Sequence, residues 1–163
     1  MDCIYESGIC NTAGYSLRDD GDIRVINNEW DDNKWGGGVG KAFVVDPSKD
    51  EGYLKVKFVP LVPAGDYKVV STDYDSYTVI YTCMGLPGVY NIEYVWILTR
   101  DVNPSDEVMN AAFDVVKEKL PKYDLTALYS TPQGAGALES GEDCPYTSAP
   151  TTPKGYFADY FLQ

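Results

Sequence analysis

Short segments in which apolar side chains alternate with polar ones are the feature that most constrains the fold. Alternation with a period of two is typical of β-strands that bury one face. The polar, glycine-rich residues 31–38 are predicted to form a hairpin loop. The repeated strand and turn signals predict an all-β barrel or sandwich. The predicted strands span residues 12–18, 22–29, 39–45, 53–59, 67–71, 77–83 and 92–99.

A single helical segment follows these strands. Asn103 is a candidate cap, Pro104 suits the first helical position and Pro121 ends the segment. A further short strand is predicted over residues 125–130, and the chain beyond residue 131 is predicted to be irregular. The apolar residues that fall on one helical face are Val108, Ala111, Ala112, Val115, Val116 and Leu120.

Strand parity predicts which side chains face the interior. Lys55 and Lys57 must face water, so Phe58 faces the other way. Residues 92–99 are apolar on both faces, and a strand buried on both sides needs a second layer. The predicted helix is the candidate to cover Val95 and Ile97. The same parity turns these residues inward: Tyr15, Val25, Asn27, Phe58, Tyr67, Val69, Tyr94, Trp96 and Leu98.

Charge and composition exclude several classes of function. Lys and Arg number 13 against 25 Asp and Glu, which gives a net charge of −12. Such a surface repels nucleic-acid phosphates and anionic lipid headgroups. Histidine is absent, which excludes Ser-His-Asp and Cys-His catalysis and His-ligated metal sites. We therefore expect no metal, no cofactor and no enzymatic activity. The sequence has no run of 18 apolar residues, so we also expect no membrane span.

The four cysteines are Cys3, Cys10, Cys83 and Cys144. They form no Cys-x-x-Cys pair, so a structural zinc site is not expected. An even number at wide spacing favours two disulfides in a secreted or lumenal oxidising compartment, with three connectivities open. The alternative is four unpaired thiols in the cytosol. Residues 1–6 lack the basic and apolar regions of a secretory signal.

Three motifs carry a resemblance to a known family. Residues 65–77, with the turn Thr72-Asp73-Tyr74, resemble the second signature of the lipocalins, and residues 95–100 resemble the third, in which a strand ends in Arg100 before the helix. Cys10 and residues 15–21 resemble the opening of the second barrel strand. The chain is most similar to the apolipoprotein D, bilin-binding and crustacyanin-type lipocalins, over about residues 10–146.

The resemblance implies an up-and-down antiparallel barrel of seven to eight strands with one outer helix near residues 104–120. It divides the chain into a barrel with its tail, residues 1–146, and an extension, residues 147–163, that docks elsewhere or replaces a strand. The first strand of the family and its Gly-x-Trp motif are missing. Three explanations stay open: the chain is a fragment, a partner supplies the strand, or the aromatic residues 156–162 replace it.

The resemblance also implies disulfides and a ligand. Cys10 and Cys144 match a family pair, and Cys83 matches a cysteine for which Cys3 is the remaining partner. Positions matching Tyr15, Asn27, Trp96 and Leu98 line the ligand cavity in the apolipoprotein D type. We therefore expect binding, with transport or storage, of a small hydrophobic ligand of the lipid, sterol, retinoid, carotenoid or bilin type.

Other interpretations compete with this one. Each inward aromatic residue is also compatible with packed core, whereas Asn27 on an apolar strand needs a ligand or water as partner. Asp73 is expected to form a turn rather than to catalyse. A structural or scaffolding subunit is the alternative function, with a protein partner or self-association through the open barrel edge or the tail. A lipocalin-type enzyme is the third hypothesis, and it lacks an inward reduced cysteine.

Overall fold

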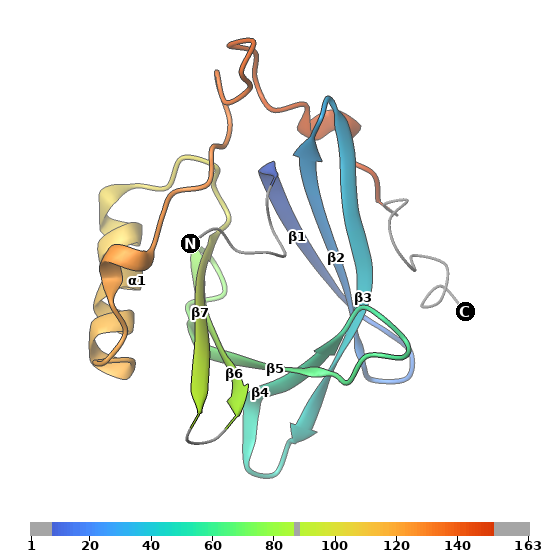
Figure 1. Ribbon diagram of the computed structural model, residues 1–163, viewed down its shortest axis with the longest axis vertical. Coiled ribbons are helices and arrows are strands. Elements are labelled where there is room, and N and C mark those ends of the chain that lie inside the picture. The colour runs from blue at the N-terminus through green and yellow to red at the C-terminus, as the bar shows by residue number, and fades with distance from the viewer. Residues whose placement is uncertain (1–7, 87–88, 152–163) are drawn as a thin grey trace. The chain divides into compact units, whose positions relative to one another are not determined.

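A single sheet in chain order forms the frame of the protein. The computed structural model describes residues 8–86 and 89–151 (Figure 1). Seven strands lie in the order β1-β2-β3-β4-β5-β6-β7, so each strand neighbours the next along the chain. All seven predicted strands are present, which confirms the all-β, up-and-down arrangement. The strands are β1 (Ile9–Leu17), β2 (Ile23–Asp31), β3 (Lys34–Asp46), β4 (Asp50–Lys57), β5 (Gly65–Thr72), β6 (Tyr77–Leu86) and β7 (Tyr90–Thr99).

Three helical elements follow the strands. They are α1 (Asp106–Lys119) and two short 3₁₀ turns, η1 (Leu125–Ala127) and η2 (Tyr146–Ser148). The chain divides into two compact units. Among the described residues, the β1–β3 unit holds 8–43, 56–64 and 130–151, and the β5–β7 unit holds 44–55, 65–86 and 89–129.

The turn between β2 and β3 is shorter than the sequence predicts. Asp32 and Asn33 both have positive φ, at 49° and 57°, which is the two-residue turn that suits a twisted hairpin. The register then pairs Trp30 with Trp35, and their rings meet edge to face with centroids 5.3 Å apart. The prediction of a loop over residues 31–38 is therefore wrong, because the glycines that suggested it lie inside β3.

Gly37 shows why that strand needs glycine. Its φ is +137°, and a Cβ on it would lie 2.0 Å from the backbone oxygen of Asn27. A side chain cannot fit there without moving β2. Gly36 has ordinary space instead, since the nearest atom to its Cβ would be Glu29 Cγ at 3.9 Å.

Residues 144–151, called the C-terminal segment below, lie against one face of the β1–β3 unit. Asn28 Nδ2 donates to the backbone oxygen of Pro150 at 3.3 Å, and Trp35 Nε1 donates to Ser148 Oγ at 3.0 Å. The Cys10–Cys144 disulfide attaches this segment to β1. These contacts cover Asn28, which is 8% exposed. The sequence predicted an irregular tail but not this packing.

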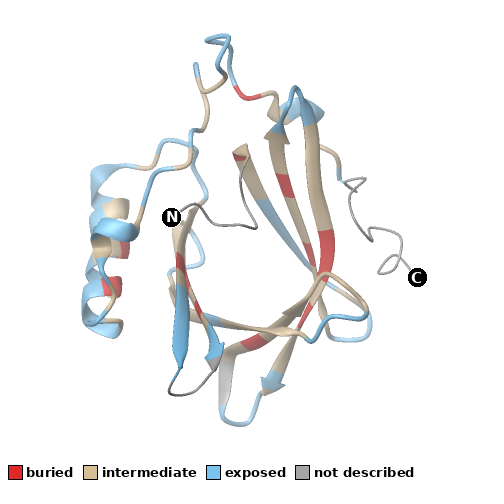
Figure 2. Cartoon of the chain, viewed as in Figure 1, coloured by how far each residue is buried: buried red, intermediate tan, exposed pale blue. Residues whose placement is uncertain are grey.

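The core of the β5–β7 unit lies between the sheet and α1. Val79 and Val95 are buried against Ala112 and Val116, and Ile97 packs at the edge of the same cluster. Figure 2 shows buried positions on the side of α1 that faces β7. The prediction that the helix covers Val95 and Ile97 is confirmed.

The boundaries of α1 differ slightly from the prediction. Ser105, rather than Asn103, caps the helix, because its Oγ accepts from Val108 N at 3.4 Å. Acidic residues in the first turn and lysines in the last turn complement the helix dipole. No helix in the described part of the chain is long and apolar enough to cross a membrane.

Residues 125–130 do not form the predicted strand. Asp124 Oδ1 accepts from Thr126 N at 2.9 Å, which bends the backbone into η1. Leu125 and Leu128 then pack against the helix-covered core. Leu125 and Leu128, which suggested a strand, are therefore partly buried by a turn instead.

We expect Gly37→Ala to destabilise the protein by at least about 2 kcal/mol, because it combines a strained φ with a clash against backbone. Gly36→Ala, the adjacent control, is expected to change stability by less than about 0.5 kcal/mol. Urea unfolding of both variants measures the difference. Equal midpoints for the two variants would contradict the hairpin geometry.

Candidate functional site

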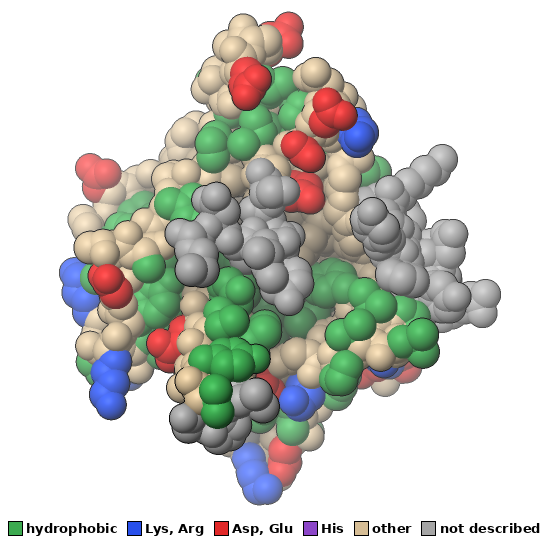
Figure 3. Space-filling view, viewed as in Figure 1, with side chains coloured by type: hydrophobic (Ala, Val, Ile, Leu, Met, Phe, Trp, Pro, Cys, Tyr) green, Lys and Arg blue, Asp and Glu red, His purple; other side chains and the backbone are tan. Residues whose placement is uncertain are grey.

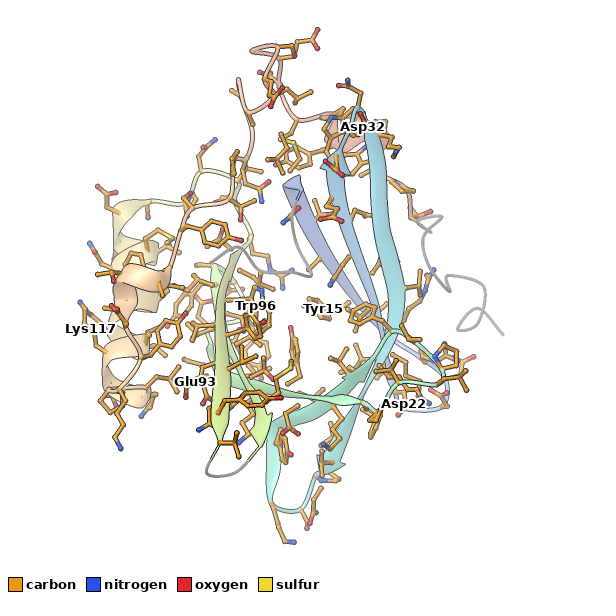
Figure 4. The ribbon with its side chains drawn as sticks, viewed as in Figure 1. Tyr15, Asp22, Asp32, Glu93, Trp96 and Lys117 are labelled. Carbon is orange, nitrogen blue, oxygen red and sulfur yellow. A yellow bond between two sulfur atoms is a disulfide. The ribbon has the colours of Figure 1, made fainter. Side chains whose placement is uncertain are left out.

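The face of β5–β7 that points away from α1 is apolar and aromatic. The register pairs Val69 with Ile80 and Ile80 with Trp96, so these three residues form one row across the strands. Tyr94 stacks on Trp96, with ring centroids 5.6 Å apart and planes at 21°. Figure 4 shows Trp96 on the side of β7 opposite α1. The predicted residues on this face, called the β5–β7 face below, are Tyr67, Val69, Tyr94, Trp96 and Leu98.

The two threonine hydroxyls on this face donate to backbone oxygens. Thr82 Oγ1 donates to the backbone oxygen of Asp66 at 2.7 Å, and Thr78 Oγ1 donates to that of Ser71 at 3.2 Å. Thr82 is opposite Tyr94 and Thr78 is opposite Leu98 in the register. With these hydroxyls paired, the face offers mainly hydrocarbon and aromatic surface to a ligand.

The β1–β3 unit carries a second such face. Tyr15, Val25 and Gly40 share one row of the register, and Asn27 is opposite Gly38. A Cβ on Gly40 would lie 2.7 Å from the ring of Phe58, so the glycine makes room for that ring. Val25 is 2% exposed and Tyr15 is 47% exposed. The predicted residues on this face, called the β1–β3 face below, are Tyr15, Val25, Asn27 and Phe58.

Asn27 is the polar exception on the β1–β3 face. Its Oδ1 is buried and accepts no hydrogen bond from any described residue. A buried carbonyl oxygen without a donor destabilises the fold by about 1–3 kcal/mol. The sequence singled out Asn27 on parity alone, and this geometry makes it a candidate to accept a hydrogen bond from a ligand.

The comparisons with known proteins agree on one family. The lipocalin-like domain family matches residues 3–133. Temperature-induced lipocalin-1 of Arabidopsis thaliana is 33% identical over 156 residues, which cover 92% of this chain and 76% of that protein. The chain belongs to the lipocalin family.

Two further comparisons place this lipocalin among its relatives. Apolipoprotein D of Macaca fascicularis is 34% identical over 109 residues, which cover 64% of this chain and 56% of that protein. The chain thus spans little more than half the length of that relative. The crystal structure of lobster apocrustacyanin A1 matches with a TM-score of 0.72 at 20% identity, covering 91% of this chain and 76% of the other. That likeness confirms the lipocalin fold.

The lipocalin signature residues build the turn between β5 and β6. Asp73 Oδ1 accepts from the backbone nitrogens of Asp75, Ser76 and Tyr77 at 2.8–3.1 Å. These backbone donors, with that of Tyr77 first, lower the pKa of Asp73 from 3.8 to about 2. Thr72 Oγ1 accepts from the backbone nitrogen of Tyr74 at 3.0 Å.

Arg100 joins this turn to the end of β7. Its guanidinium donates to the backbone oxygen of Tyr74 at 3.2 Å, and its backbone nitrogen donates to that of Ser76 at 2.9 Å. Tyr74 has a positive φ of 66°. The guanidinium therefore provides a donor for the backbone oxygen of the turn residue whose φ is positive.

One of the two expected disulfides is present in the structure. The Cys10–Cys144 bond is present, which confirms the pairing that the lipocalin resemblance implied and indicates an oxidising compartment. Cys83 forms no disulfide with another described cysteine. Cys3 lies outside the described residues, so a Cys3–Cys83 bond stays a prediction. Cys83 shares the α1-facing side of β6 with Tyr81, whose hydroxyl donates to Glu93 Oε1 at 2.6 Å.

Sequence reasoning missed Ile80, which lies between Val69 and Trp96 on the β5–β7 face. The signal was present, because Val79 and Ile80 are adjacent apolar residues, so one of them must lie on each side of β6. The described residues contain no cluster of three or more His, Cys, Asp and Glu side chains that could hold a metal ion.

We expect the stabilising effect of Asp73 to depend on pH. The folded pKa is lowered, so its contribution is present above about pH 4 and is lost as the pH falls towards about 2. The melting temperature of the wild type should exceed that of Asp73→Ala at pH 6, and the gap should narrow by pH 2. Asp19→Ala, which removes an exposed carboxyl elsewhere, is the control. A gap that stays constant with pH would contradict the hydrogen-bonded turn.

Proposed function

We propose that this lipocalin binds a small hydrophobic ligand of the lipid, sterol, retinoid, carotenoid or bilin type, and that it transports or stores it. The observation that carries the proposal is the stacked Tyr94–Trp96 pair on an apolar face that α1 does not cover. Lipocalins bind small hydrophobic ligands, which supports the same role here. Each face is proposed as a ligand-contacting surface in its own right. The residues proposed to contact a ligand are Tyr67, Val69, Tyr94, Trp96 and Leu98 on the β5–β7 face, and Tyr15, Val25, Asn27 and Phe58 on the β1–β3 face.

The energetics suit a reversible carrier. Removing a chain of about 14 methylene groups from water contributes roughly 11 kcal/mol. Association costs at least about 4 kcal/mol, which leaves an affinity in the micromolar range. Such binding needs neither covalent attachment nor a catalytic group, so we propose a binding protein rather than an enzyme. The oxidising compartment indicated by Cys10–Cys144 supports secretion.

Asn27 narrows the chemistry of the ligand. Its unpaired atom is the carbonyl oxygen Oδ1, so the complementary group must donate a hydrogen bond. A hydroxyl or a pyrrole-type N–H provides such a donor, whereas an ester or an ionised carboxylate does not. We therefore propose a ligand with an apolar body and a donor at its polar end.

We expect Trp96→Ala to weaken binding of dansyl-undecanoic acid by about 10-fold or more, because an aromatic contact worth about 1.5–3 kcal/mol is lost. Trp35→Ala is the matched control, since Trp35 contacts the C-terminal segment instead. Its affinity should stay within about 2-fold of the wild type. The measurement is a fluorescence titration. Equal affinities for both variants, or no binding by the wild type, would favour the scaffolding alternative.

The proposed hydrogen bond from the polar end of the ligand to Asn27 is tested with the variant Asn27→Leu. We expect this variant to bind all-trans-retinol about 5- to 10-fold more weakly, because it loses one hydrogen bond of about 1–1.5 kcal/mol. Binding of retinyl acetate, which has no hydroxyl donor, should change by less than about 2-fold. The variant should also be at least as stable as the wild type, because it removes an unpaired buried oxygen. An equal loss for both ligands would contradict the proposed hydrogen bond.

A further inference from the structure

The end of the β6–β7 hairpin exposes a group of large apolar side chains. Val89 is 75% exposed, Tyr90 52%, Ile92 43% and Met84 42%. These four residues are called the apolar tip below. Figure 3 shows hydrophobic side chains gathered at this end of β7. Several large exposed apolar side chains at one hairpin end make this surface a candidate for contact with another molecule.

Charge is absent from this stretch of sequence. Residues 84–92 contain no Asp, Glu, Lys or Arg, although the chain as a whole has a net charge of −12. The first charged residue after the stretch is Glu93. Among the described residues of the hairpin end, Asn91 is the polar side chain, and the register pairs it with Gly85.

The apolar tip continues the β5–β7 face. Met84 is opposite Ile92 in the register, and this pair follows the Thr82–Tyr94 and Ile80–Trp96 pairs along the hairpin. Because side chains two residues apart share a face, Ile92 lies on the same side of β7 as Tyr94 and Trp96. Apolar side chains therefore extend from the stacked aromatic pair to solvent along β7, while on β6 Thr82, whose hydroxyl donates to backbone, lies between Ile80 and Met84.

We propose that the apolar tip docks onto the surface of a zwitterionic phospholipid membrane. An uncharged surface without basic residues has no attraction for anionic headgroups, and the acidic chain is repelled by them. Tyr90 has the amphipathic ring that favours the membrane interface. A protein partner would be expected to meet a polar rim with several hydrogen-bonding groups, whereas the described side chains of residues 84–92 offer the Asn91 amide and the Tyr90 hydroxyl.

Docking in this way would give the ligand a route that avoids water. A hydrophobic molecule that leaves the lipid at Met84 and Ile92 stays in contact with apolar side chains as far as Trp96. This consequence rests on the proposed ligand binding, whereas the docking itself does not. Titration of dansyl-undecanoic acid in buffer without vesicles tests ligand binding alone. Cosedimentation with vesicles tests docking alone.

The test is cosedimentation of the full chain with vesicles of pure phosphatidylcholine and with vesicles that contain 30% phosphatidylserine. We expect binding to phosphatidylcholine and weaker binding when phosphatidylserine is present. The variant Val89→Ser/Tyr90→Ser should lower the partition coefficient by about 10-fold. Val45→Ser/Val102→Ser is the matched control, because these side chains are 43% and 42% exposed elsewhere in the β5–β7 unit. Far-UV circular dichroism verifies that each variant keeps its strands.

Each result decides the proposal. Loss of binding in the tip variant alone supports it. Equal binding by the tip and control variants, stronger binding to phosphatidylserine, or no binding by the wild type overturns it. Concentration-dependent dimers that the tip variant abolishes, without vesicle binding, would assign the surface to a second copy instead. If the double variant loses its strand signal, the single variant Tyr90→Ser gives the same readout with a smaller expected loss of about 3-fold.

Discussion

β7 is apolar on both of its faces, and the β5–β7 unit is arranged around that constraint. Val95 and Ile97 are covered by α1, which buries Ala112 and Val116 against them. The opposite face presents Tyr94 and Trp96, which α1 cannot reach. One strand thus belongs to a structural core on one side and to a candidate binding face on the other. A sheet with a polar second face would provide the core without the binding surface.

The β1–β3 unit also has one packed face and one candidate binding face, but a different element covers the packed face. One face is covered by the C-terminal segment, which Asn28 and Trp35 hold through hydrogen bonds. The Cys10–Cys144 bond closes a loop of 134 residues in sequence, which in the chain-entropy description stabilises the fold by on the order of 4–5 kcal/mol. The other face holds Phe58 over Gly40, and no described residue donates to Asn27 Oδ1. Structural packing and candidate binding are again assigned to opposite sides of the strands.

Period-two alternation was enough to predict the seven strands, and helical spacing was enough to predict the buried face of α1. Both signals are local and reflect one-sided burial. The glycines of residues 36–38 misled the prediction, because Gly37 serves a close backbone approach inside β3 rather than a loop. The packing of Pro150 on Asn28 joins residues 122 apart, and no local pattern carries that information. The unpaired state of Asn27 Oδ1 likewise depends on tertiary neighbours, whereas its inward direction followed from parity.

The central claim is that the β5–β7 face, which α1 does not cover, binds a small hydrophobic ligand. The most direct measurement is to incubate the protein with a total lipid extract, separate the protein from unbound lipid, and identify what it retains by solvent extraction, mass spectrometry and absorption spectroscopy. The account predicts that one class of compound is retained in near-stoichiometric amount, with an apolar body and a hydroxyl or N–H donor. Recovery of folded protein that retains no such compound would contradict it.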